Sequence, residues 1–405
     1  MGTLTRRKMI AGSAGASLAA ALPRFARAAS YDPGASDSEI RVGQFGPLSG
    51  PVSSFGVLAT AMAAYFKMLN ESGGINGRKV TFINYDDAYS PPKSVEAARK
   101  LVESDEVLLI AGSMGTPGNL AIQKYMNAKK VPQLFLAAGA SKLADPAHYP
   151  WTMIYASTFE REGAVAGKYL ASSMPQAKIA VLYQDDDAGR ATLGTLRASL
   201  GASGPKIVSE MTYNVTDPTI DSQLVQMKVS GADVVVLNTI PRMASQALQK
   251  FYVMDWHPQI FLGAGNASVT ATLKPAGFEK AQGALAFATS QDPGNPIWDD
   301  QPGMKQYRAF LSRYAPTADA ASGMFAAGYS IAYTVAHVLR QCGNDLTRAN
   351  VLKEATSLKD FATPLLIPGI TMNTSPTDYV PIKRYQLMRF KGEQYERVGD
   401  PVASD

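Results

Sequence analysis

The sequence is poor in the residues that most often bind metals or carry redox chemistry, with one cysteine and three histidines among 405 residues. Cys342 cannot form an intramolecular disulfide, and its place at the end of an apolar run from Met324 predicts a core residue. His148, His257 and His337 are far apart in the sequence, and none has a partner at metal-ligand spacing. We therefore expect no metal and no cofactor.

The motifs of common enzyme classes are missing as well. After residue 28 the chain has neither a Gly-x-Ser-x-Gly nucleophile elbow nor a phosphate-binding loop. The run Gly263-Ala264-Gly265 lacks the third glycine of a dinucleotide fingerprint, and we interpret it as a loop after a strand. Since no nucleophile–base pair is visible either, the sequence does not predict an enzyme.

A surplus of one charge sign is also missing from the main part of the chain. The whole sequence has 39 basic and 34 acidic residues, but residues 1–28 hold five of the basic ones and no acid. The remainder is therefore close to neutral. No basic cluster with interleaved aromatic residues appears, so we expect no nucleic-acid partner.

Residues 1–28 have the pattern of an export signal. A twin-arginine sequence at residues 5–10 (TRRKMI) precedes an alanine-rich apolar run to Leu22 and a small-x-small site at residues 26–28. The run is too short for a membrane-spanning helix, and no later segment supplies the ~20 apolar residues that one needs. We expect cleavage after Ala28, export to a bacterial periplasm by the twin-arginine route, and no lipid anchor, because no cysteine follows the cleavage site.

Two successive strands are each followed by a loop of small residues. The apolar run Val107–Ala111 leads into Gly112–Gly115, and the run Val131–Ala137 leads into Ala138–Ser141. Thr116-Pro117 predicts a helix start, with threonine as the N-cap. Strand ends of a parallel sheet lie side by side, and helix N-termini there offer free N–H groups. These loops are either tight connections only or a site for a small molecule with a carboxylate or another acceptor.

Strand and helix patterns alternate along the chain, as is typical of right-handed βαβ units in an α/β fold with parallel sheets. A first set covers residues 39–156, and the pattern restarts at about residue 157. We therefore predict two lobes, each a doubly wound parallel sheet, with chain crossings near residues 155–158, 287–292 and 363–370. Lobes joined in this way form a hinge, and closure buries a ligand between them.

Local signals add detail to the second half of the chain. Asp217-Pro218 predicts the start of a helix that runs to Ser230. Three helices are expected near residues 301–314, 322–341 and 347–357. Residues 379–398 predict a terminal hairpin around Lys391-Gly392.

Four segments carry a resemblance to a known family, and they are GPLSGPVSSFG (46–56), NESGGINGRKV (70–80), YDDAYSPPKSVEAARKLVESDEVLLIAGS (85–113) and QDDDAGRATL (184–193). With these, the chain resembles the branched-chain amino-acid (Leu/Ile/Val) class of periplasmic solute-binding proteins of ABC transporters. The resemblance implies a type I fold with three interlobe crossings, no catalysis, and delivery of a ligand to a membrane permease by a monomer. Lobe 1 would comprise residues 39–156 and 290–364, and lobe 2 residues 157–289 and 365–400.

The resemblance also implies which residues contact the ligand. In the first lobe, the family's aromatic falls on Phe55, its first ligand loop on Gly115 and Thr116, and its second ligand loop on Ala138, Gly139 and Ala140. In the second lobe, the aromatic falls on Ala188, the turn on Thr239 and the acid on Gly265. The hydroxyl of the second loop is missing unless Ser141 serves. The acid that pairs with an α-amino group in Leu-type binders is missing at Gly265.

The missing acid changes the expected ligand. A buried ammonium without a carboxylate partner is costly. Arg242, at the start of a predicted helix, opposes the helix dipole and grips carboxylates well. With Phe55, and Phe159 or Tyr155, available for stacking, we expect a small carboxylic acid, aromatic acids included, rather than an α-amino acid.

Alternatives stay open at this point. Asp186 or Asp187 could replace the missing acid, which would restore a branched-chain amino acid or an amide as ligand. Arg242 could be a surface arginine paired with an acidic residue. The same fold also serves periplasmic sensor modules that pass the ligand state to a receptor.

Overall fold

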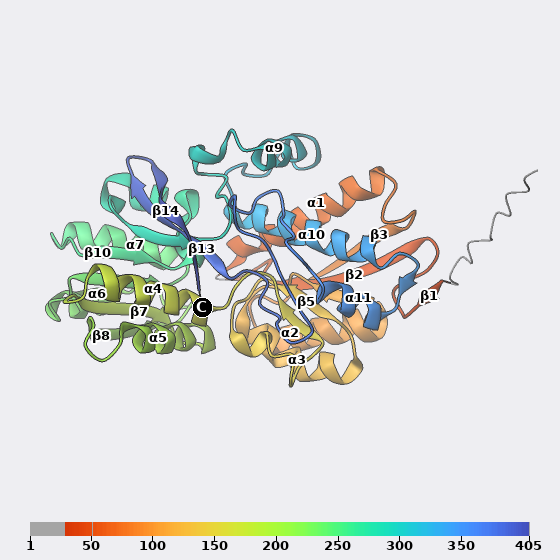
Figure 1. Cartoon of the computed structure of the whole chain (residues 1–405), viewed down its shortest axis with the longest axis horizontal. Coiled ribbons are helices and arrows are strands. Elements are labelled where there is room, and N and C mark those ends of the chain that lie inside the picture. Colours follow the sequence, from red (N-terminus) through yellow and green to blue (C-terminus); the bar gives the residue numbers. More distant parts are fainter. Residues whose placement is uncertain (1–28, 51, 405) are drawn as a thin grey trace, which may run out of the picture.

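The computed structural model describes residues 29–50 and 52–404, and the predicted export signal lies outside these residues. The described chain forms two α/β lobes that lie side by side along the long axis of the molecule (Figure 1). None of the described helices is both long and apolar enough to cross a membrane.

Lobe 1 contains a five-stranded, wholly parallel sheet in the order β3-β2-β4-β5-β6. Its strands are β2 (Glu39–Gly46), β3 (Lys79–Asp86), β4 (Leu109–Ala111), β5 (Gln133–Leu136) and β6 (Thr152–Ile154). The helices between them are α1 (Val57–Glu71), α2 (Pro91–Arg99) and α3 (Thr116–Lys129), and β1 (Ser30–Tyr31) pairs with β12 (Asp345–Leu346). Strands β4, β5 and β6 are buried along their whole length, as expected for a parallel sheet covered on both faces.

Three later helices return to this lobe, namely α9 (Pro302–Tyr314), α10 (Gly323–Gln341) and α11 (Arg348–Ala355). Helix α10 packs closely on α1, because a Cβ at Gly328 would lie 2.2 Å from the Leu58 carbonyl oxygen. Cys342 follows α10 and is buried, which confirms the predicted core position.

Lobe 2 contains a seven-stranded sheet in the order β14-β13-β11-β10-β9-β7-β8. Its strands are β7 (Lys178–Gln184), β8 (Lys206–Tyr213), β9 (Val234–Asn238), β10 (Gln259–Leu262), β11 (Leu285–Ala288), β13 (Arg384–Lys391) and β14 (Gln394–Ala403). The helices are α4 (Phe159–Ser173), α5 (Asp187–Leu200), α6 (Asp221–Val229), α7 (Pro241–Val253) and the short α8 (Lys274–Ala276). The predicted terminal hairpin forms β13 and β14, which run antiparallel at one edge, so this sheet is mixed and not wholly parallel.

The chain passes between the lobes through residues 155–158, 289–301 and 356–383, and these crossings bond to one another. The Gln291 N–H donates to the Leu365 carbonyl at 2.8 Å, and the Ile367 N–H donates to the Thr289 carbonyl at 3.0 Å. The Ile382 N–H donates to the Ala156 carbonyl at 3.0 Å. The three crossings therefore form one hydrogen-bonded hinge, while the lobe boundaries drawn from the sequence stay a prediction.

One predicted helix start is wrong: α6 begins at Asp221 and not at Asp217. The Asp217 carboxylate accepts the Asn214 N–H at 2.7 Å, and the Asp217 N–H donates to the Asn214 carbonyl at 2.9 Å. Asp217 therefore closes a turn, which is the other common role of this residue type before a helix.

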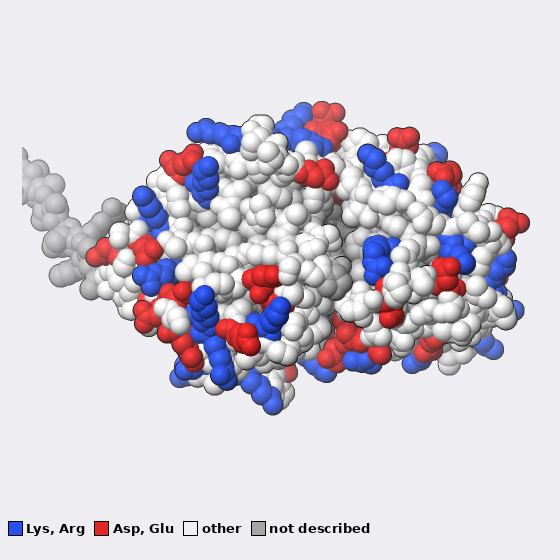
Figure 2. All heavy atoms as spheres, turned by 180° about the vertical axis from the view of Figure 1, so that it is seen from behind, with Lys and Arg blue, Asp and Glu red and all other residues white. Residues whose placement is uncertain are grey.

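The surface agrees with the balanced composition. Figure 2 shows acidic and basic side chains interspersed over both lobes on the face that it presents. Neither lobe presents a continuous field of one sign on this face, so charge alone does not single out a partner surface there.

Candidate functional site

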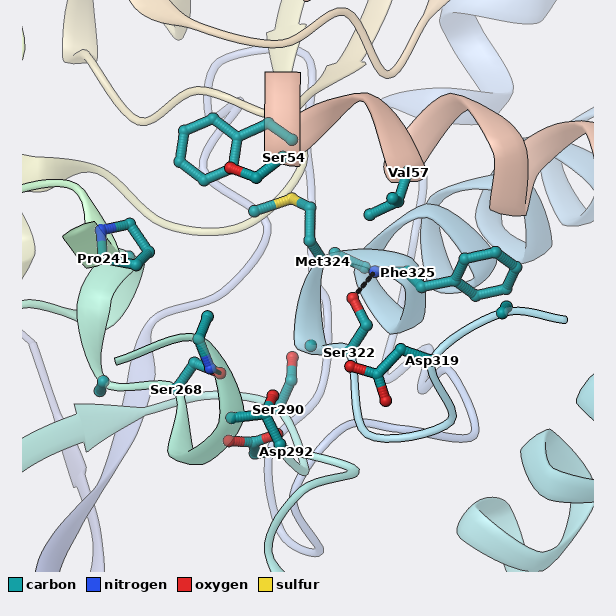
Figure 3. A pocket seen from close by; sticks show the side chains of 18 of the residues that line it. Ser54, Val57, Pro241, Ser268, Ser290, Asp292, Asp319, Ser322, Met324 and Phe325 are labelled. Carbon is teal, nitrogen blue, oxygen red and sulfur yellow. Dashed lines mark hydrogen bonds between the residues drawn. The ribbon is translucent and has the colours of Figure 1, made fainter. Parts of the chain in front are cut away.

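A cavity of about 1300 Å³ opens between the two lobes. Lobe 1 contributes the segment before α1 and the start of α10, and lobe 2 contributes the start of α7 and residues 264–271. Residues 287–292, from the end of β11 into the second crossing, close one side. Figure 3 shows Val57 and Met324 extending from the lobe 1 helices towards Pro241 and Ser268 of lobe 2. The cavity therefore lies where closure of the lobes would enclose a ligand.

The lobe 1 wall combines apolar side chains with hydroxyl groups. Phe55, Val57 and Met324 supply the apolar surface, and Ser54 and Ser322 lie beside it. The Ser322 hydroxyl caps α10 by accepting the Phe325 N–H at 3.2 Å, the contact marked in Figure 3. This wall suits a ligand with an apolar or aromatic body.

Two carboxyl groups on the hinge side of the cavity are held by backbone N–H groups. Asp292 accepts the Val269 N–H at 3.0 Å and the Gly294 N–H at 2.9 Å, and burial raises the pKa of its carboxyl. Asp319 accepts the Ala321 N–H at 3.0 Å. Both acids therefore shape the loops that line the cavity.

Helix α7 begins at Pro241 beside the cavity, and its N-cap residue Ile240 makes no side-chain cap bond. The Ile240 N–H instead donates to the Tyr213 hydroxyl at 2.8 Å. Proline suits this first helical position, where its missing N–H is not needed. The first turn of the helix thus presents partial positive charge to the cavity.

Arg242 lines the same cavity, and its guanidinium also holds a neighbouring loop. It donates to the Pro218, Val215 and Asp217 carbonyls at 3.2, 3.3 and 2.9 Å. Arg242 therefore contacts neutral carbonyl oxygens in these three bonds, and not the acidic side chain that the surface-arginine alternative assumed.

The loop at Gly265 faces open space, since a Cβ there would meet no heavy atom within 4 Å. Behind it, Asn266 donates to the Leu237 carbonyl at 2.8 Å and to the Thr239 hydroxyl at 3.0 Å. Thr239 thus supports the loop, although the resemblance implied a ligand contact.

An acid does lie beside this loop, and it is Glu162 of α4. Its carboxylate accepts the Ala264 N–H at 2.5 Å, and burial raises the pKa of this carboxyl to about 7. Neither of the acids considered from the sequence takes this place. Asp186 caps α5 by accepting the Gly189 N–H, and Asp187 pairs with Lys142.

The first predicted ligand loop is covered by a tyrosine. Gly115, with φ of 94°, is the N-cap of α3. The Thr116 hydroxyl is therefore not the cap that the sequence predicted, because helical geometry already begins at Thr116. A Cβ at Gly115 would lie only 2.4 Å from the Tyr89 ring. Tyr89 follows β3, and sequence reasoning missed it although it stands in a strand-end loop.

The second predicted ligand loop contacts lobe 2 directly. The Gly139 carbonyl accepts the Phe159 N–H at 2.7 Å, and Ser141 donates its N–H and hydroxyl to the Glu160 carboxylate. Ala140 forms a small apolar cluster with Leu136 and Leu143, and Ala138 packs against this cluster.

Three of the ten predicted site residues, Phe55, Arg242 and Gly265, line the cavity. The other seven lie outside it, and they are Gly115, Thr116, Ala138, Gly139, Ala140, Ala188 and Thr239. Ala188 lies in the first turn of α5, where its carbonyl accepts the Thr192 hydroxyl at 3.1 Å. A ligand role for each of the ten stays a prediction.

Two α/β lobes, three bonded crossings and a cavity between the lobes define a type I periplasmic binding protein. Residues 39–394 match the family model described as "Periplasmic binding protein", and the chain belongs to this family. It is a solute-binding protein of the ABC-transporter type and not an enzyme, and the family's location is periplasmic.

Relatives and solved structures agree with this assignment. The chain is 25% identical over 335 residues to the "Leucine-, isoleucine-, valine-, threonine-, and alanine-binding protein" of Pseudomonas aeruginosa, covering 80% of this chain and 88% of that protein. A branched-chain amino-acid ABC transporter structure from Thermus thermophilus with bound valine matches with a TM-score of 0.83 at 16% identity, covering 91% of this chain and 97% of that one. A fatty acid ABC transporter substrate-binding protein from Thermomonospora curvata matches with a TM-score of 0.77 at 19% identity, covering 93% and 95%. At these identities the structural matches show the fold.

Proposed function

We propose that this protein captures a small organic acid in the interlobe cavity and delivers it to the membrane permease of an ABC importer. The proposed ligand class rests on the start of α7, which lies at the cavity and has no side-chain cap bond. Arg242, in the first turn of the same helix, also lines the cavity. Helix N-termini favour carboxylates through their partial positive charge. This charge carries the argument here, because Pro241 has no N–H and the Met243 N–H donates to the Ile240 carbonyl at 3.1 Å.

Arg242 keeps its capacity for an anion despite its bonds to the protein. Its hydrogen bonds to the loop at residues 215–218 go to neutral carbonyl oxygens, which do not neutralise the guanidinium charge. A guanidinium has five N–H donors, so donors remain for a ligand carboxylate. A carboxylate in the cavity would therefore gain both the helix start and a full positive charge.

The rest of the cavity suits the body of such an acid. Phe55, Val57 and Met324 offer aromatic and flexible apolar surface on lobe 1. The volume of about 1300 Å³ exceeds the roughly 300–1,000 Å³ of common small-molecule sites, so a body larger than a leucine side chain fits. Aromatic acids and branched short-chain acids are therefore included in the proposal.

A branched-chain amino acid is the second candidate, and Glu162 is the observation that favours it. This carboxyl lies at the loop where the resemblance expects the acid for a ligand ammonium. The Pseudomonas aeruginosa relative, by its name, binds leucine, isoleucine, valine, threonine and alanine. The organic acid takes precedence because Arg242 lines the cavity itself, whereas Glu162 lies behind the loop and the two cavity acids, Asp292 and Asp319, already accept backbone N–H groups.

A thermal-shift screen with matched ligand pairs tests the proposal. The pairs are leucine with 4-methylpentanoate and phenylalanine with 3-phenylpropanoate, which differ by the amino group. A ligand at 100 times its Kd stabilises the folded state by about 2.7 kcal/mol, and this raises the melting temperature. We expect the acids without an amino group to give the larger shifts. Larger shifts from both amino acids would establish the second candidate instead.

A sensor module that signals to a receptor remains the alternative to transport. Genes for a permease and an ATPase beside the coding gene support transport, and a receptor-kinase gene there supports sensing.

Export by the twin-arginine route is likewise a proposal. Changing Arg6 and Arg7 together to lysine should retain the precursor in the cytoplasm.

A further inference from the structure

The cavity wall on lobe 2 includes a short loop that is anchored from behind by one carboxylate. Ala264 and Gly265 of this loop line the cavity. The Glu162 carboxylate accepts the Ala264 N–H at 2.5 Å and lies 3.3 Å from the position of a Cβ at Gly263. The position of the cavity wall therefore depends directly on the Glu162 side chain.

The other bonds of this loop come from groups that do not titrate. The Gly263 N–H donates to the Leu237 carbonyl at 3.0 Å, and Asn266 donates to the Leu237 carbonyl and the Thr239 hydroxyl. Among these anchors, Glu162 is the ionisable one. One hydrogen bond thus connects this ionisable group to the cavity wall.

We propose that Glu162 is a positioning residue that holds the cavity loop at Ala264 and couples proton uptake or release to ligand binding. The sign of this coupling rests on the proposed function, because it depends on the charge of the ligand. The coupling itself rests on the geometry of Glu162, Ala264 and the cavity.

The surroundings of Glu162 place its titration in an accessible range. Burial is the main cause that raises the pKa to about 7, and the Ala264 N–H opposes it. The charges of Glu162, Arg161 and Glu160 on α4 all act on the pKa of Tyr385 on β13, so these four groups lie near one another. Burial also raises the pKa of Tyr385, so this phenol stays neutral near pH 7.

The ligand charge decides the direction of the effect. An anion in the cavity disfavours the ionised Glu162, raises its pKa and draws a proton in, so the affinity increases as the pH falls. A ligand ammonium beside the loop lowers the pKa and releases a proton, so the affinity increases as the pH rises. From a pKa of about 7, a shift of half a unit to one unit corresponds to a change in affinity of about 2.5-fold to fivefold between about pH 8 and about pH 6.

Titration calorimetry in two buffers of different ionisation enthalpy measures both the affinity and the protons exchanged. The probes are 4-methylpentanoate and leucine, whose own charges stay constant over this range. Glu162→Gln keeps an oxygen that accepts the Ala264 N–H but cannot ionise. Glu162→Ala removes the acceptor, and circular dichroism verifies that each variant is folded.

We expect the wild type to take up protons with 4-methylpentanoate and Glu162→Gln to bind it with a flatter pH profile. Glu162→Ala should bind more weakly at every pH, because the loop loses its anchor. Identical pH profiles and proton numbers for the wild type and Glu162→Gln would overturn the proposal. Proton release with leucine that is lost in Glu162→Gln would support the coupling, and if leucine also binds more tightly than 4-methylpentanoate, it would overturn the organic-acid function.

Discussion

The cleft between the lobes has two unlike halves. Beside α1, α10 and α7 it is open, with apolar and hydroxyl groups around a cavity of about 1300 Å³. Beside α3 and α5 it is closed, because Tyr89 covers Gly115 and the 139–142 loop bonds to lobe 2. The loops of both halves follow strand ends, so a shared position at the edge of a sheet does not by itself make a shared binding surface.

The closed half is built by a strained loop. Ala88 and Tyr89 both have left-handed backbones, with φ of 49° and 61°, which cost roughly 1–2 kcal/mol each. Asp86 accepts the Ala88 N–H at 2.9 Å, and Asp87 accepts the Tyr89 N–H at 2.8 Å. The Tyr89 pKa is raised to about 12 by burial and then by the charge of Asp186 on lobe 2. Lobe 1 therefore holds the backbone of Tyr89 in a position where its hydroxyl lies close to the Asp186 charge of lobe 2.

The largest effect that separates the halves is expected from one predicted ligand glycine in each half, Gly115 and Gly265. Gly115→Ala should lower the free energy of unfolding by about 2–4 kcal/mol, since the φ of 94° is unfavourable and the Cβ would meet the Tyr89 ring. Gly265→Ala is the control, with a change within about 0.5 kcal/mol, because its Cβ meets nothing within 4 Å. Denaturant unfolding measures both, and equal losses would contradict the contrast between the halves.

Ligand affinity should separate the halves in the opposite sense. Phe55→Ala removes an aromatic wall of the open cavity and should weaken binding by about 1–3 kcal/mol. Thr116→Val, in the closed half, should change the affinity by less than about 0.5 kcal/mol. Calorimetry with the ligand found in the screen decides between them. A stronger effect of Thr116→Val would return the binding site to the loops that the resemblance implied.

Tyr89→Phe tests whether the hydroxyl contributes to the closed half. Burial raises the Tyr89 pKa and Gln184 opposes this effect, so the Gln184 side chain of lobe 2 lies close to the Tyr89 hydroxyl. If the hydroxyl bonds across the cleft, its loss should reduce the free energy of unfolding by about 0.5–1.5 kcal/mol. Tyr252→Phe on the exposed end of α7 serves as the control, and its stability should stay unchanged. Equal behaviour of the two variants would remove the hydroxyl of Tyr89 from the contact.

The smallest effect is expected from the ion pair at the rim of the closed half. Lys142 and Asp187 lie 3.3 Å apart and are both well exposed, so Lys142→Ala should cost less than about 1 kcal/mol. Added salt should reduce even this difference. A double-mutant cycle with Asp187→Ala measures the pair directly, and a coupling that persists at high salt would contradict an exposed contact.

Much of the fold could be predicted from the sequence because local signals and burial agree. The apolar runs at β4, β5 and β9 are buried on both faces, and the Thr116-Pro117 and Pro241 signals coincide with the starts of α3 and α7. The helix start predicted at Asp217 was wrong because aspartate is as common in a turn as it is before a helix.

The candidate site was less predictable, since it depends on residues that meet only in three dimensions. Phe55, Gly265 and Arg242 come from distant segments, yet they line one cavity. Glu162 meets Ala264 across 102 positions of sequence, and an acid in the first turn of a helix looks the same whether or not it supports a ligand loop. Tyr89 lies in a strand-end loop, but its ring packs against Gly115 because Ala88 and Tyr89 have positive φ angles. The sequence does not predict these two backbone angles.

A calorimetric comparison of two ligands on refolded, ligand-free wild-type protein tests the organic-acid function directly. Leucine and 4-methylpentanoate share the same branched body and carboxylate, and only leucine carries an ammonium. Arg242 and the start of α7 predict that 4-methylpentanoate binds more tightly, since they offer positive charge to the carboxylate. Gly265 offers no acid to an ammonium, and the cavity acids Asp292 and Asp319 already accept backbone N–H groups. Micromolar binding of leucine, together with no heat from 4-methylpentanoate or 3-phenylpropanoate, would contradict the organic-acid function.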